Sequence, residues 1–386
     1  MEFGNEGTNG IASRKPLTNL NRSSGFELKS SLSPARICTI VVFTDSAPMP
    51  ESDAPSQPQK ILVTGAAGFI ASRVAGLLHS LGQQVIGLDN FNDAYDVRLK
   101  MWRWVQLENL PGIELHRMDL TETAALERLF AKHARAGAPF DAVINLAARA
   151  GVRPSVENPR LYVDANIVGA LNVMEMCRKF GVKKFVLAST SSLYGREHAT
   201  PYREEMNTDH QLSPYAATKK AAEAMAYTYH LLHGLDVSVL RYFTVYGPAG
   251  RPDMTPLRFT QRIREGRVIT IFGDGSQSRD FTYVDDIARG TISALRPVGY
   301  DTFNLGSDQP LKLSEMISLI EELTGHHAKI EYRPWHPADM AETWADIGKA
   351  RKHLDWSPQT SIRDGMHRLA QWYEENRDWA KDIDTN

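Results

Sequence analysis

The sequence has little cysteine and little net charge. Its 386 residues include only two cysteines, Cys38 and Cys177, and no CxxC pair. A disulfide scaffold and a cysteine-built zinc site are therefore excluded, and the sequence predicts a reducing, cytoplasmic location. Lys and Arg number 44 against 46 Asp and Glu, so the net charge of −2 favours neither nucleic acid nor an anionic membrane as a partner.

Long hydrophobic runs are also missing. Near the N-terminus the longest apolar stretch is 37–43, far below the roughly 20 residues that span a bilayer, and it lacks the flanks of a signal peptide. Residues 1–59 are rich in Ser, Asn, Pro and Gly without helical or strand periodicity, which predicts a disordered leader. A stray strand at 37–43 and a transit peptide are alternatives, and Met49 is an alternative start.

From Lys60 onward, short apolar strands alternate with helices. The chain is 42% hydrophobic and 23% charged, which indicates a globular protein with a sizeable core, and its length suggests about two structural units. Strands that are apolar on both faces predict a Rossmann-type, doubly wound parallel α/β sheet covered by helices on each side. The predicted strands are 60–63, 85–88, 113–115, 142–146, 185–188 and 237–240, and the predicted helices are 69–81, 122–133, 166–180 and 215–232.

After Tyr246 the alternation loosens into segments rich in Gly and Pro, and helices are predicted again at 314–324 and 362–376. No internal repeat is present. The pattern predicts a first domain over 60–245, to which 284–300 returns. It also predicts a smaller, less regular C-terminal domain that comprises 246–283 and 301–386.

The segment 64–71, TGAAGFIA, joins the first predicted strand to the first helix. Glycines in such a turn let backbone amides approach a pyrophosphate at the positive end of the helix. Asp89 ends the second strand 24 residues after Gly65, and a carboxylate there binds a ribose diol and repels a 2′-phosphate, which favours NAD over NADP. Asp119 and Leu120 follow the third strand, where an adenine would lie. The alternatives are a purely structural glycine turn and a helix cap at Asp119.

Tyr215 and Lys219 are four residues apart in SPYAATK and share one face of a predicted helix. A nearby ammonium stabilises a phenolate, so we expect the pKa of Tyr215 to fall toward neutrality, as a general base for alcohol oxidation requires. The hydroxyl cluster 189–192 follows the fifth strand, at the sheet edge where open α/β folds bind ligands. A polar loop with capping hydroxyls is the alternative for this cluster.

From about Lys60 to the last helix, the chain resembles the extended short-chain dehydrogenase/reductase family, and more narrowly its UDP-glucuronate 4-epimerases. The resemblance rests on the motifs TGAAGFIAS, LDNFNDAYD, NLAARAGVRPSVENP, STSSLYG, SPYAATKKA, RYFTVYGPAGRPDM and SRDFTYVDD. It implies that Tyr215 is the base, that Lys219 assists it and holds the nicotinamide ribose, and that Thr190 is a second catalytic side chain. The NAD-binding residues would be Gly65, Ala67, Gly68, Phe69, Ile70, Asp89, Asp119, Leu120, Ala147, Tyr215 and Lys219.

The resemblance also implies the substrate contacts. Ser191 and Ser192 would line the sugar pocket, and Thr244 and Arg251 would meet the sugar carboxylate, for which a guanidinium is the natural bidentate partner. Arg279 would contact the nucleotide diphosphate. The alternatives are a solvated loop arginine at Arg251 and a surface ion pair at Arg279. Two positions depart from the family pattern: Ala71 replaces the third glycine of the phosphate loop, and Arg149 stands where these epimerases more often have Gln.

The implied activity is NAD-dependent 4-epimerisation of UDP-glucuronate to UDP-galacturonate through a transient 4-ketone, with no metal. Related decarboxylases carry Glu after the catalytic Thr and dehydratases carry Asp-Glu, whereas Ser191 and Ser192 stand here, which favours an epimerase. The alternatives are a 4-epimerase of a neutral UDP-hexose, a decarboxylase or dehydratase, and a silent NAD-binding scaffold. A homodimer through 166–180 and 215–232 is also implied, although the apolar residues there could equally be core: Val168, Leu171, Met225 and Leu231.

Overall fold

The computed structural model describes residues 58–335 and 340–385, so the predicted leader at 1–59 lies almost wholly outside the described residues. Within the described part, seven strands form one sheet in the order β10-β6-β5-β4-β1-β2-β3, and every neighbouring pair is parallel. The predicted doubly wound sheet is therefore confirmed. The strands are β1 (Lys60–Thr64), β2 (Gln84–Asp89), β3 (Glu114–Arg117), β4 (Ala142–Asn145), β5 (Lys184–Thr190), β6 (Asp236–Tyr242) and β10 (Tyr300–Leu305).

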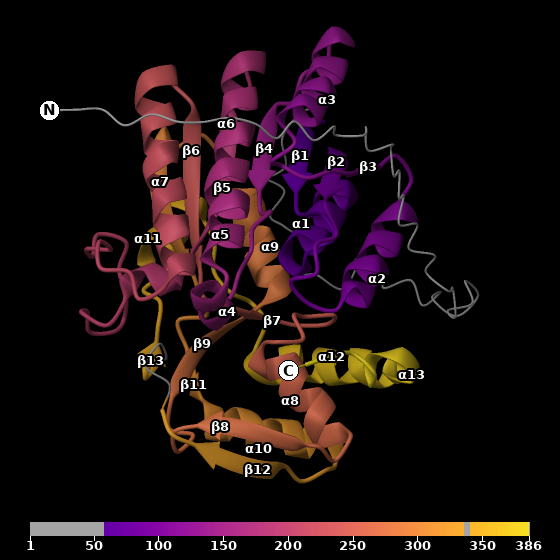
Figure 1. The fold of residues 1–386 in the computed structure, drawn as a ribbon, viewed down its shortest axis with the longest axis vertical. Coiled ribbons are helices and arrows are strands. Elements are labelled where there is room, and N and C mark those ends of the chain that lie inside the picture. Colours follow the sequence, from indigo (N-terminus) through magenta and orange to yellow (C-terminus); the bar gives the residue numbers. More distant parts are fainter. Residues whose placement is uncertain (1–57, 336–339, 386) are drawn as a thin grey trace, which may run out of the picture. The chain divides into compact units, whose positions relative to one another are not determined.

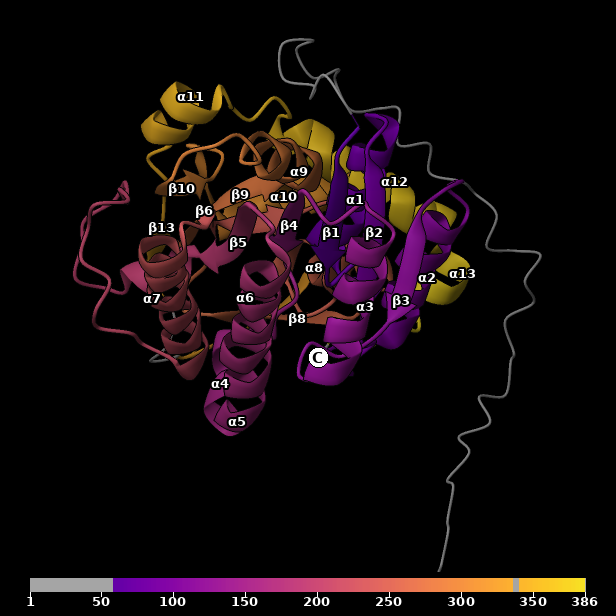
Figure 2. The ribbon, with the colours of Figure 1, turned by 90° about the horizontal axis from the view of Figure 1, so that it is seen from above.

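Helices cover both faces of this sheet (Figure 2). They do so because the central strands are apolar on both sides, so each face of the sheet must be shielded from water. One face carries α1 (Phe69–Ser80) and α9 (Val284–Ser293), and α2 (Val97–Glu108) packs beside α1. The other face carries α3 (Thr123–Arg135), α6 (Gly169–Phe180) and α7 (Pro214–His233). The order of the strands reverses between β1 and β4, which is where sheets of this kind bind ligands at their carboxyl ends.

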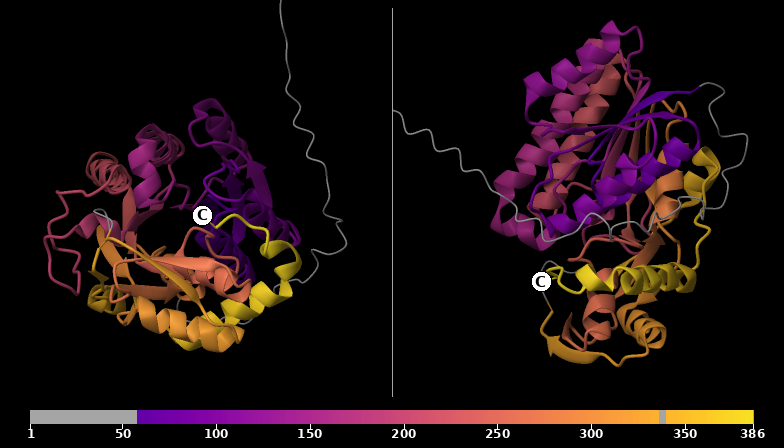
Figure 3. Two further views of the ribbon diagram at one scale, coloured as in Figure 1. Left: turned by 60° about the horizontal axis from the view of Figure 1, so that its bottom comes forward. Right: turned by 90° about the vertical axis from the view of Figure 1, so that its right-hand side faces the viewer.

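A second group of elements lies below the main sheet in Figure 1 and is seen from two other sides in Figure 3. It contains a mixed four-stranded sheet and a parallel strand pair, and its helices enclose a third hydrophobic core. The strands are β7 (Thr244–Tyr246), β9 (Ser278–Tyr283), β11 (Pro310–Lys312), β13 (Glu342–Thr343), β8 (Val268–Phe272) and β12 (Lys329–Arg333). The helices are α8 (Thr255–Arg264), α10 (Leu313–Thr324), α12 (Ile362–Glu375) and α13 (Arg377–Ala380), with α11 (Gly348–Leu354) beside β10.

The connection from β4 to β5 contains short helical turns that the sequence pattern does not predict. These are α4 (Val152–Glu157), α5 (Pro159–Tyr162) and a π-helical turn, Val163–Val168, that runs directly into α6. After β5 a 3₁₀ turn, Ser191–Tyr194, follows. The six helices predicted from the sequence are otherwise confirmed, with ends that differ by a few residues.

The predicted domain boundary at 300 needs a correction. Strand β10 pairs with β6, so residues 301–305 lie in the main sheet and not in the second part of the chain. This edge strand carries Asp301, Thr302 and Asn304, and these polar residues hide the apolar pattern by which the other strands are recognised. The assignment of the two parts to NAD and to the nucleotide sugar stays a prediction. None of the described helices combines the length and apolar content that crossing a bilayer requires.

Candidate active site

Two adjoining pockets open at the carboxyl ends of the main sheet. The first, called here the Asp89 pocket, has a volume of about 290 Å³ and contains the ends of β2 and β4. The second, called here the Tyr215 pocket, has a volume of about 320 Å³ and contains the end of β5 and the start of α7. Seven residues line both pockets and so join them: Gly65, Gly68, Tyr95, Leu146, Ala148, Ala150 and Arg251.

The phosphate loop lies where the two pockets meet, and its shape depends on glycine. Gly65 has a φ of +74°, and a Cβ there would lie 2.9 Å from Ala147 Cα. A Cβ on Gly68 would lie 2.7 Å from the Gly65 carbonyl oxygen. Helix α1 begins at the next residue, and no side chain of the described residues caps its first turn. The loop therefore leaves backbone N–H groups at a positive helix end open to the pockets, which fits the pyrophosphate of a dinucleotide.

The other residues predicted for the phosphate loop and its surroundings differ in whether they line a pocket. Phe69 and Ile70 line the Tyr215 pocket, and Ala147 lines the Asp89 pocket, while the binding of NAD by these residues stays a prediction. Ala67 is fully buried and lines neither pocket; its carbonyl accepts a hydrogen bond from Arg103 instead. Ala67 therefore helps to hold the loop in place through its carbonyl.

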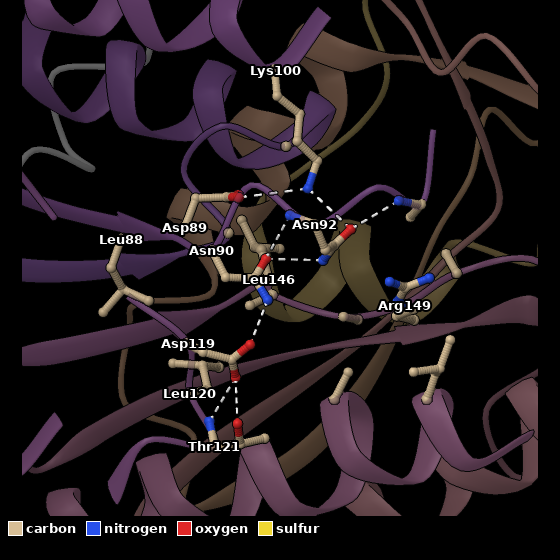
Figure 4. Close-up of a pocket in the computed structure, with 18 of the residues that line it drawn as sticks. Leu88, Asp89, Asn90, Asn92, Lys100, Asp119, Leu120, Thr121, Leu146 and Arg149 are labelled. Carbon is tan, nitrogen blue, oxygen red and sulfur yellow. Dashed lines mark hydrogen bonds and ion pairs between the residues drawn. The ribbon is translucent and has the colours of Figure 1, made fainter. Parts of the chain in front are cut away.

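Acidic side chains line one end of the Asp89 pocket (Figure 4). Asp89 Oδ1 accepts the N–H of Phe91 at 2.7 Å and lies 3.5 Å from Lys100 Nζ. Asp119 accepts hydrogen bonds from Asn90 Nδ2 and from the N–H of Thr121, which lower the pKa of its carboxyl although burial alone would raise it. Asp119 therefore caps a turn and also lines the pocket, and its contact with an adenine stays a prediction.

The Tyr215 pocket contains the predicted proton-transfer group. Ser213 caps α7 by accepting the N–H of Ala216 at 3.2 Å, and this places Tyr215 in the first turn of the helix. Lys219 follows one turn later, and Thr190, the last residue of β5, hydrogen-bonds to Tyr215. All three residues line the pocket, together with Ser191, Ser192, Thr244 and Arg251.

The predicted pKa of Tyr215 is wrong for the ligand-free protein. Burial raises the pKa of Tyr215 above its ordinary value, and this outweighs the hydrogen bond from Thr190 and the charge of Arg251, which lower it. Burial also lowers the pKa of Lys219 to about 8, although Glu223 raises it. The helical spacing suggests an attraction between phenolate and ammonium, but enclosure in protein disfavours the charged form of both groups.

The pKa of Lys219 leads to a stability prediction. Between pH 8 and 10.5 the unfolded chain keeps a proton on this amine that the folded chain has lost, so folding stability rises with pH there. A drop from 10.5 to about 8 corresponds to about 3 kcal/mol. We expect Lys219→Met to raise the free energy of unfolding of the nucleotide-free protein by up to that amount at pH 7 and by little at pH 10.5.

Urea unfolding of both proteins at the two pH values measures this difference. Lys220→Met, at the neighbouring position of the same helix, is the matched control. A stability difference for Lys219→Met that does not change between pH 7 and pH 10.5 would contradict the burial of a charged amine at this position.

Arg251 lies in the loop between β7 and α8 and lines both pockets. Its Nε and Nη2 donate to the two carboxylate oxygens of Asp253 at 3.0 and 2.5 Å, and Nη2 also donates to Ala150 O at 3.3 Å. Burial lowers its pKa, but the carboxylate of Asp253 outweighs burial and the net shift is upward. Arg251 is therefore a fixed cation at the junction of the pockets and not a solvated loop arginine.

Like Ala67, the predicted site residue Arg279 lies outside both pockets. It belongs to β9, where it pairs with Thr343 of β13, and its Nη1 donates to the carbonyl of Ser278 at 2.7 Å. Thr343 lines a small cavity of about 60 Å³ that also contains Ser191 and Ser192. Contact of Arg279 with a diphosphate stays a prediction.

A family model described as the NAD dependent epimerase/dehydratase family matches residues 61–306, which is more than half of the chain. A relative from Thermodesulfobacterium geofontis, UDP-glucuronate 4-epimerase, is 53% identical over 323 residues, covering 83% of this chain and 98% of that protein. The chain belongs to the NAD dependent epimerase/dehydratase family.

Solved structures from this family have the same fold. UDP-glucuronic acid 4-epimerase from Bacillus cereus, in complex with UDP-glucuronic acid and NAD, has a TM-score of 0.76 and 36% identity, covering 82% of this chain and 99% of that one. UDP-glucose 4-epimerase from Thermotoga maritima, with UDP-glucose, has a TM-score of 0.74 and 31% identity, covering 82% and 99%. Epimerases of both acidic and neutral sugars are thus similar to this chain.

Some residues of this family member line the pockets or support them without having been predicted from the sequence. Lys100 and Tyr95 line the Asp89 pocket. Arg149, which the resemblance placed beside the cofactor, also lines this pocket and forms an ion pair with Asp93 at 2.9 Å. Asn166 in the π-helical turn bonds to both backbone groups of Arg149 and to Thr218, next to Lys219. A π-helical turn often marks a functional site, but it leaves no trace in the hydrophobic pattern of a sequence.

Three arginines beside the Tyr215 pocket were also missed. Arg153 follows Val152, which lines the pocket, and Arg258 follows pocket residue Met254 by about one turn of α8. Burial lowers the pKa of Arg258, and the like charges of Arg262 and Arg153 lower it further. A concentration of positive charge next to a pocket favours an anionic ligand.

Proposed function

We propose that the chain catalyses the NAD-dependent 4-epimerisation of UDP-glucuronate to UDP-galacturonate. The observation that carries this proposal is the position of the Arg251 guanidinium. It is fixed at the junction of the two pockets and lines the pocket that also contains Tyr215, Lys219 and Thr190. A guanidinium in this place complements the carboxylate by which a uronate differs from a neutral hexose. The likeness to UDP-glucuronate 4-epimerases from two bacteria supports the same substrate.

The residues of the phosphate loop and of the Asp89 pocket would hold NAD. Gly65 and Gly68 would let its pyrophosphate approach the uncapped N-terminus of α1, and Asp89 would offer a carboxylate to its adenosine ribose. When bound, NAD supplies a positively charged nicotinamide ring that takes the C4 hydrogen with its electron pair and later returns it.

Tyr215 takes the proton of the sugar 4-hydroxyl and gives it back when the other face of the 4-ketone is reduced. Thr190, bonded to Tyr215, holds the phenol oxygen in place, and Lys219 supplies positive charge one helical turn away. Because burial raises the pKa of Tyr215 in the free protein, the phenolate forms only where further positive charge surrounds it.

The 4-ketone of a uronate is a β-keto acid and loses carbon dioxide readily when an acid or base assists. Ser191 and Ser192 occupy the places where related decarboxylases and dehydratases carry acidic residues, and both line the Tyr215 pocket. Neither hydroxyl is an efficient proton donor or acceptor at neutral pH. Return of the C4 hydrogen therefore outruns decarboxylation, and the product is the epimer.

Incubation of the purified protein with UDP-glucuronate and NAD, followed by NMR, tests this function. We expect UDP-galacturonate to accumulate without net reduction of NAD. A UDP-pentose would instead show a decarboxylase. Turnover of UDP-glucose with none of UDP-glucuronate would favour the second candidate, a neutral UDP-hexose 4-epimerase, which the likeness to the Thermotoga maritima enzyme supports.

The diphosphate of the substrate is assigned to the arginines next to the Tyr215 pocket. Arg153, Arg258 and Arg262 bring three positive charges together there. Burial lowers the pKa of Arg258, and the charges of Arg262 and Arg153 lower it further. An anionic diphosphate would relieve this repulsion. Arg279 is proposed as a further contact, because its strand partner Thr343 lines the small cavity that also contains Ser191 and Ser192.

We also propose a homodimer that pairs through α6 and α7. Of the four apolar residues named from the sequence, Leu171 and Met225 pack against the core, whereas Val168 and Leu231 are 37% and 66% exposed. Leu232 and Tyr227 add to the apolar surface on α7. An exposed apolar surface on adjacent helices is typical of an interface. The cytoplasmic location stays a prediction from the cysteine content.

Leu231→Lys is expected to convert the dimer to a monomer, because it places a charge on the exposed apolar surface of α7. Sedimentation velocity at micromolar concentration measures the change. Tyr332→Lys is the matched control, since Tyr332 is 60% exposed on β12, away from these helices. A wild-type protein that sediments as a monomer, or a Leu231→Lys variant that stays dimeric, would contradict this interface.

A further inference from the structure

Arg103 is a buried arginine that lies next to the two pockets but lines neither of them. It lies on α2 and is 2% exposed. Within the described residues its guanidinium donates five hydrogen bonds, all to uncharged oxygens. This number equals the full donor capacity of an arginine side chain.

These hydrogen bonds join two loops that are far apart in the sequence. Nη1 donates to the carbonyl of Ala67 in the phosphate loop at 3.1 Å. Nε and Nη2 donate to the carbonyl of Ala249 at 3.0 and 2.6 Å, and Nη2 also reaches the carbonyl of Gly250 at 3.2 Å. Gly250 directly precedes Arg251, so a single side chain fixes the loop that cradles a pyrophosphate to the loop that carries Arg251.

Tyr95 completes this arrangement. Its hydroxyl accepts from Arg103 Nη1 at 2.8 Å, and its ring lies 6.0 Å from the guanidinium carbon of Arg251. Tyr95 lines both pockets. Arg103 therefore contacts the backbone that precedes Arg251 and also the ring that lies beside its guanidinium.

The backbone that Arg103 holds is not in a relaxed conformation. Ala249 has a φ of +50°, in the left-handed region that residues other than glycine rarely adopt. Such a conformation persists only where surrounding contacts hold it, and the two hydrogen bonds from Arg103 to the Ala249 carbonyl are contacts of this kind.

We infer that Arg103 is a positioning residue, which holds the Arg251 loop against the phosphate loop and so places the Arg251 guanidinium for the substrate carboxylate. This inference rests on the proposed function. Lysine cannot replace the forked guanidinium of Arg103. An ammonium offers three donors from a single atom and cannot reach both loops in the same geometry. Recognition of the carboxylate thus depends on a residue that does not touch the substrate.

A double-mutant cycle on the holoenzyme tests the inference. We expect Arg103→Lys to raise KM for UDP-glucuronate about tenfold, the size of effect that loss of hydrogen bonds to a charged group produces, with kcat changed less than threefold. The inhibition constant of UDP, which lacks the carboxylate, should change less than twofold. Arg98→Lys, on the same helix and half exposed beside Asp96, is the matched control and should leave all three constants unchanged.

The second arm combines Arg103→Lys with Arg251→Ala. If Arg103 acts through Arg251, the double variant should have the kcat/KM of Arg251→Ala within about threefold, because the placement of an absent guanidinium no longer matters. If the losses in kcat/KM of the two single variants multiply in the double variant, the inference is overturned. An equal loss of UDP binding in Arg103→Lys would overturn it as well. If Arg103→Lys does not fold, Tyr95→Phe replaces it in the same cycle, because this variant removes the hydrogen bond from Arg103 Nη1 to the Tyr95 hydroxyl.

The outcomes separate the inference from the proposed function. A wild-type protein that epimerises UDP-glucuronate while Arg103→Lys has an unchanged KM would overturn the inference alone. A wild-type protein that does not turn over UDP-glucuronate would overturn both.

Discussion

Tyr215→Phe is expected to lower kcat for UDP-glucuronate epimerisation by about 10³-fold, in the range that loss of a general acid–base produces. The variant keeps the ring and loses only the oxygen that accepts the 4-hydroxyl proton. The Tyr215 ring is half-buried at the start of α7 and the variant keeps it, so the packing of the ring and the phosphate loop should remain as they are. We therefore expect NAD binding and the melting temperature to stay close to those of the wild type.

Steady-state kinetics measures the loss, and Tyr162→Phe is the matched control. The Tyr162 ring lies 6.2 Å from the Tyr215 ring, and its hydroxyl donates to the carbonyl of Ala150 at 3.3 Å. Tyr162 lines neither pocket, so we expect its variant to lose less than tenfold in kcat. If Tyr215→Phe keeps a tenth or more of the activity, Tyr215 is not the base.

Arg251→Ala is expected to lower kcat/KM for UDP-glucuronate by about 10²- to 10³-fold, because it leaves the substrate carboxylate without its ion-pair partner in a partly buried site. Two nitrogens of Arg251 donate to Asp253, and Nη1 makes no hydrogen bond to the described residues. Turnover of UDP-glucose, however slow, should not fall, since this sugar has no carboxylate.

Comparison of both substrates with the wild type, Arg251→Ala and Arg251→Lys measures this selectivity. Lysine keeps the charge but not the bidentate fork, so Arg251→Lys should lie between the other two for UDP-glucuronate. Equal effects on the two sugars would mean that Arg251 only supports the loop. An unchanged kcat/KM for UDP-glucuronate would assign the enzyme to neutral UDP-hexoses.

The main sheet could be predicted because its strands are buried on both faces and therefore stand out as apolar runs. Helix α2 could not be predicted, since the face it buries includes Lys100, Arg103 and Gln106, which break the apolar stripe. Its N-cap, Asp96, accepts the N–H of Arg98 and was the one local signal available. Strand β10 was missed for a related reason, because an edge strand tolerates polar residues.

The residues of the candidate site could be predicted better than their electrostatics. Glycine spacing, helix periodicity and strand ends place Gly65, Asp89 and Tyr215 at one edge of the sheet, and the structure brings them together there. The pKa of Tyr215 could not be predicted, because desolvation depends on everything that encloses the ring. Arg279 was placed by its motif alone, and strand pairing sets its actual surroundings.

The supporting residues were the hardest to predict. Arg103 contacts the 67 and 249–250 segments, which are 36 and 146 residues away in the sequence. No short motif contains such a contact, and only the folded chain reveals it. The sequence therefore predicts the groups that touch ligands more readily than the groups that hold them in place.

The central claim is that a hydrogen leaves C4 of UDP-glucuronate and returns to the same carbon from the opposite face. The most direct measurement uses UDP-glucuronate deuterated at C4, incubated with the holoenzyme in ordinary water, with the product analysed by NMR and mass spectrometry. The account predicts UDP-galacturonate that keeps its deuterium at C4. Loss of the deuterium to water, or a product changed at any other carbon, would contradict it.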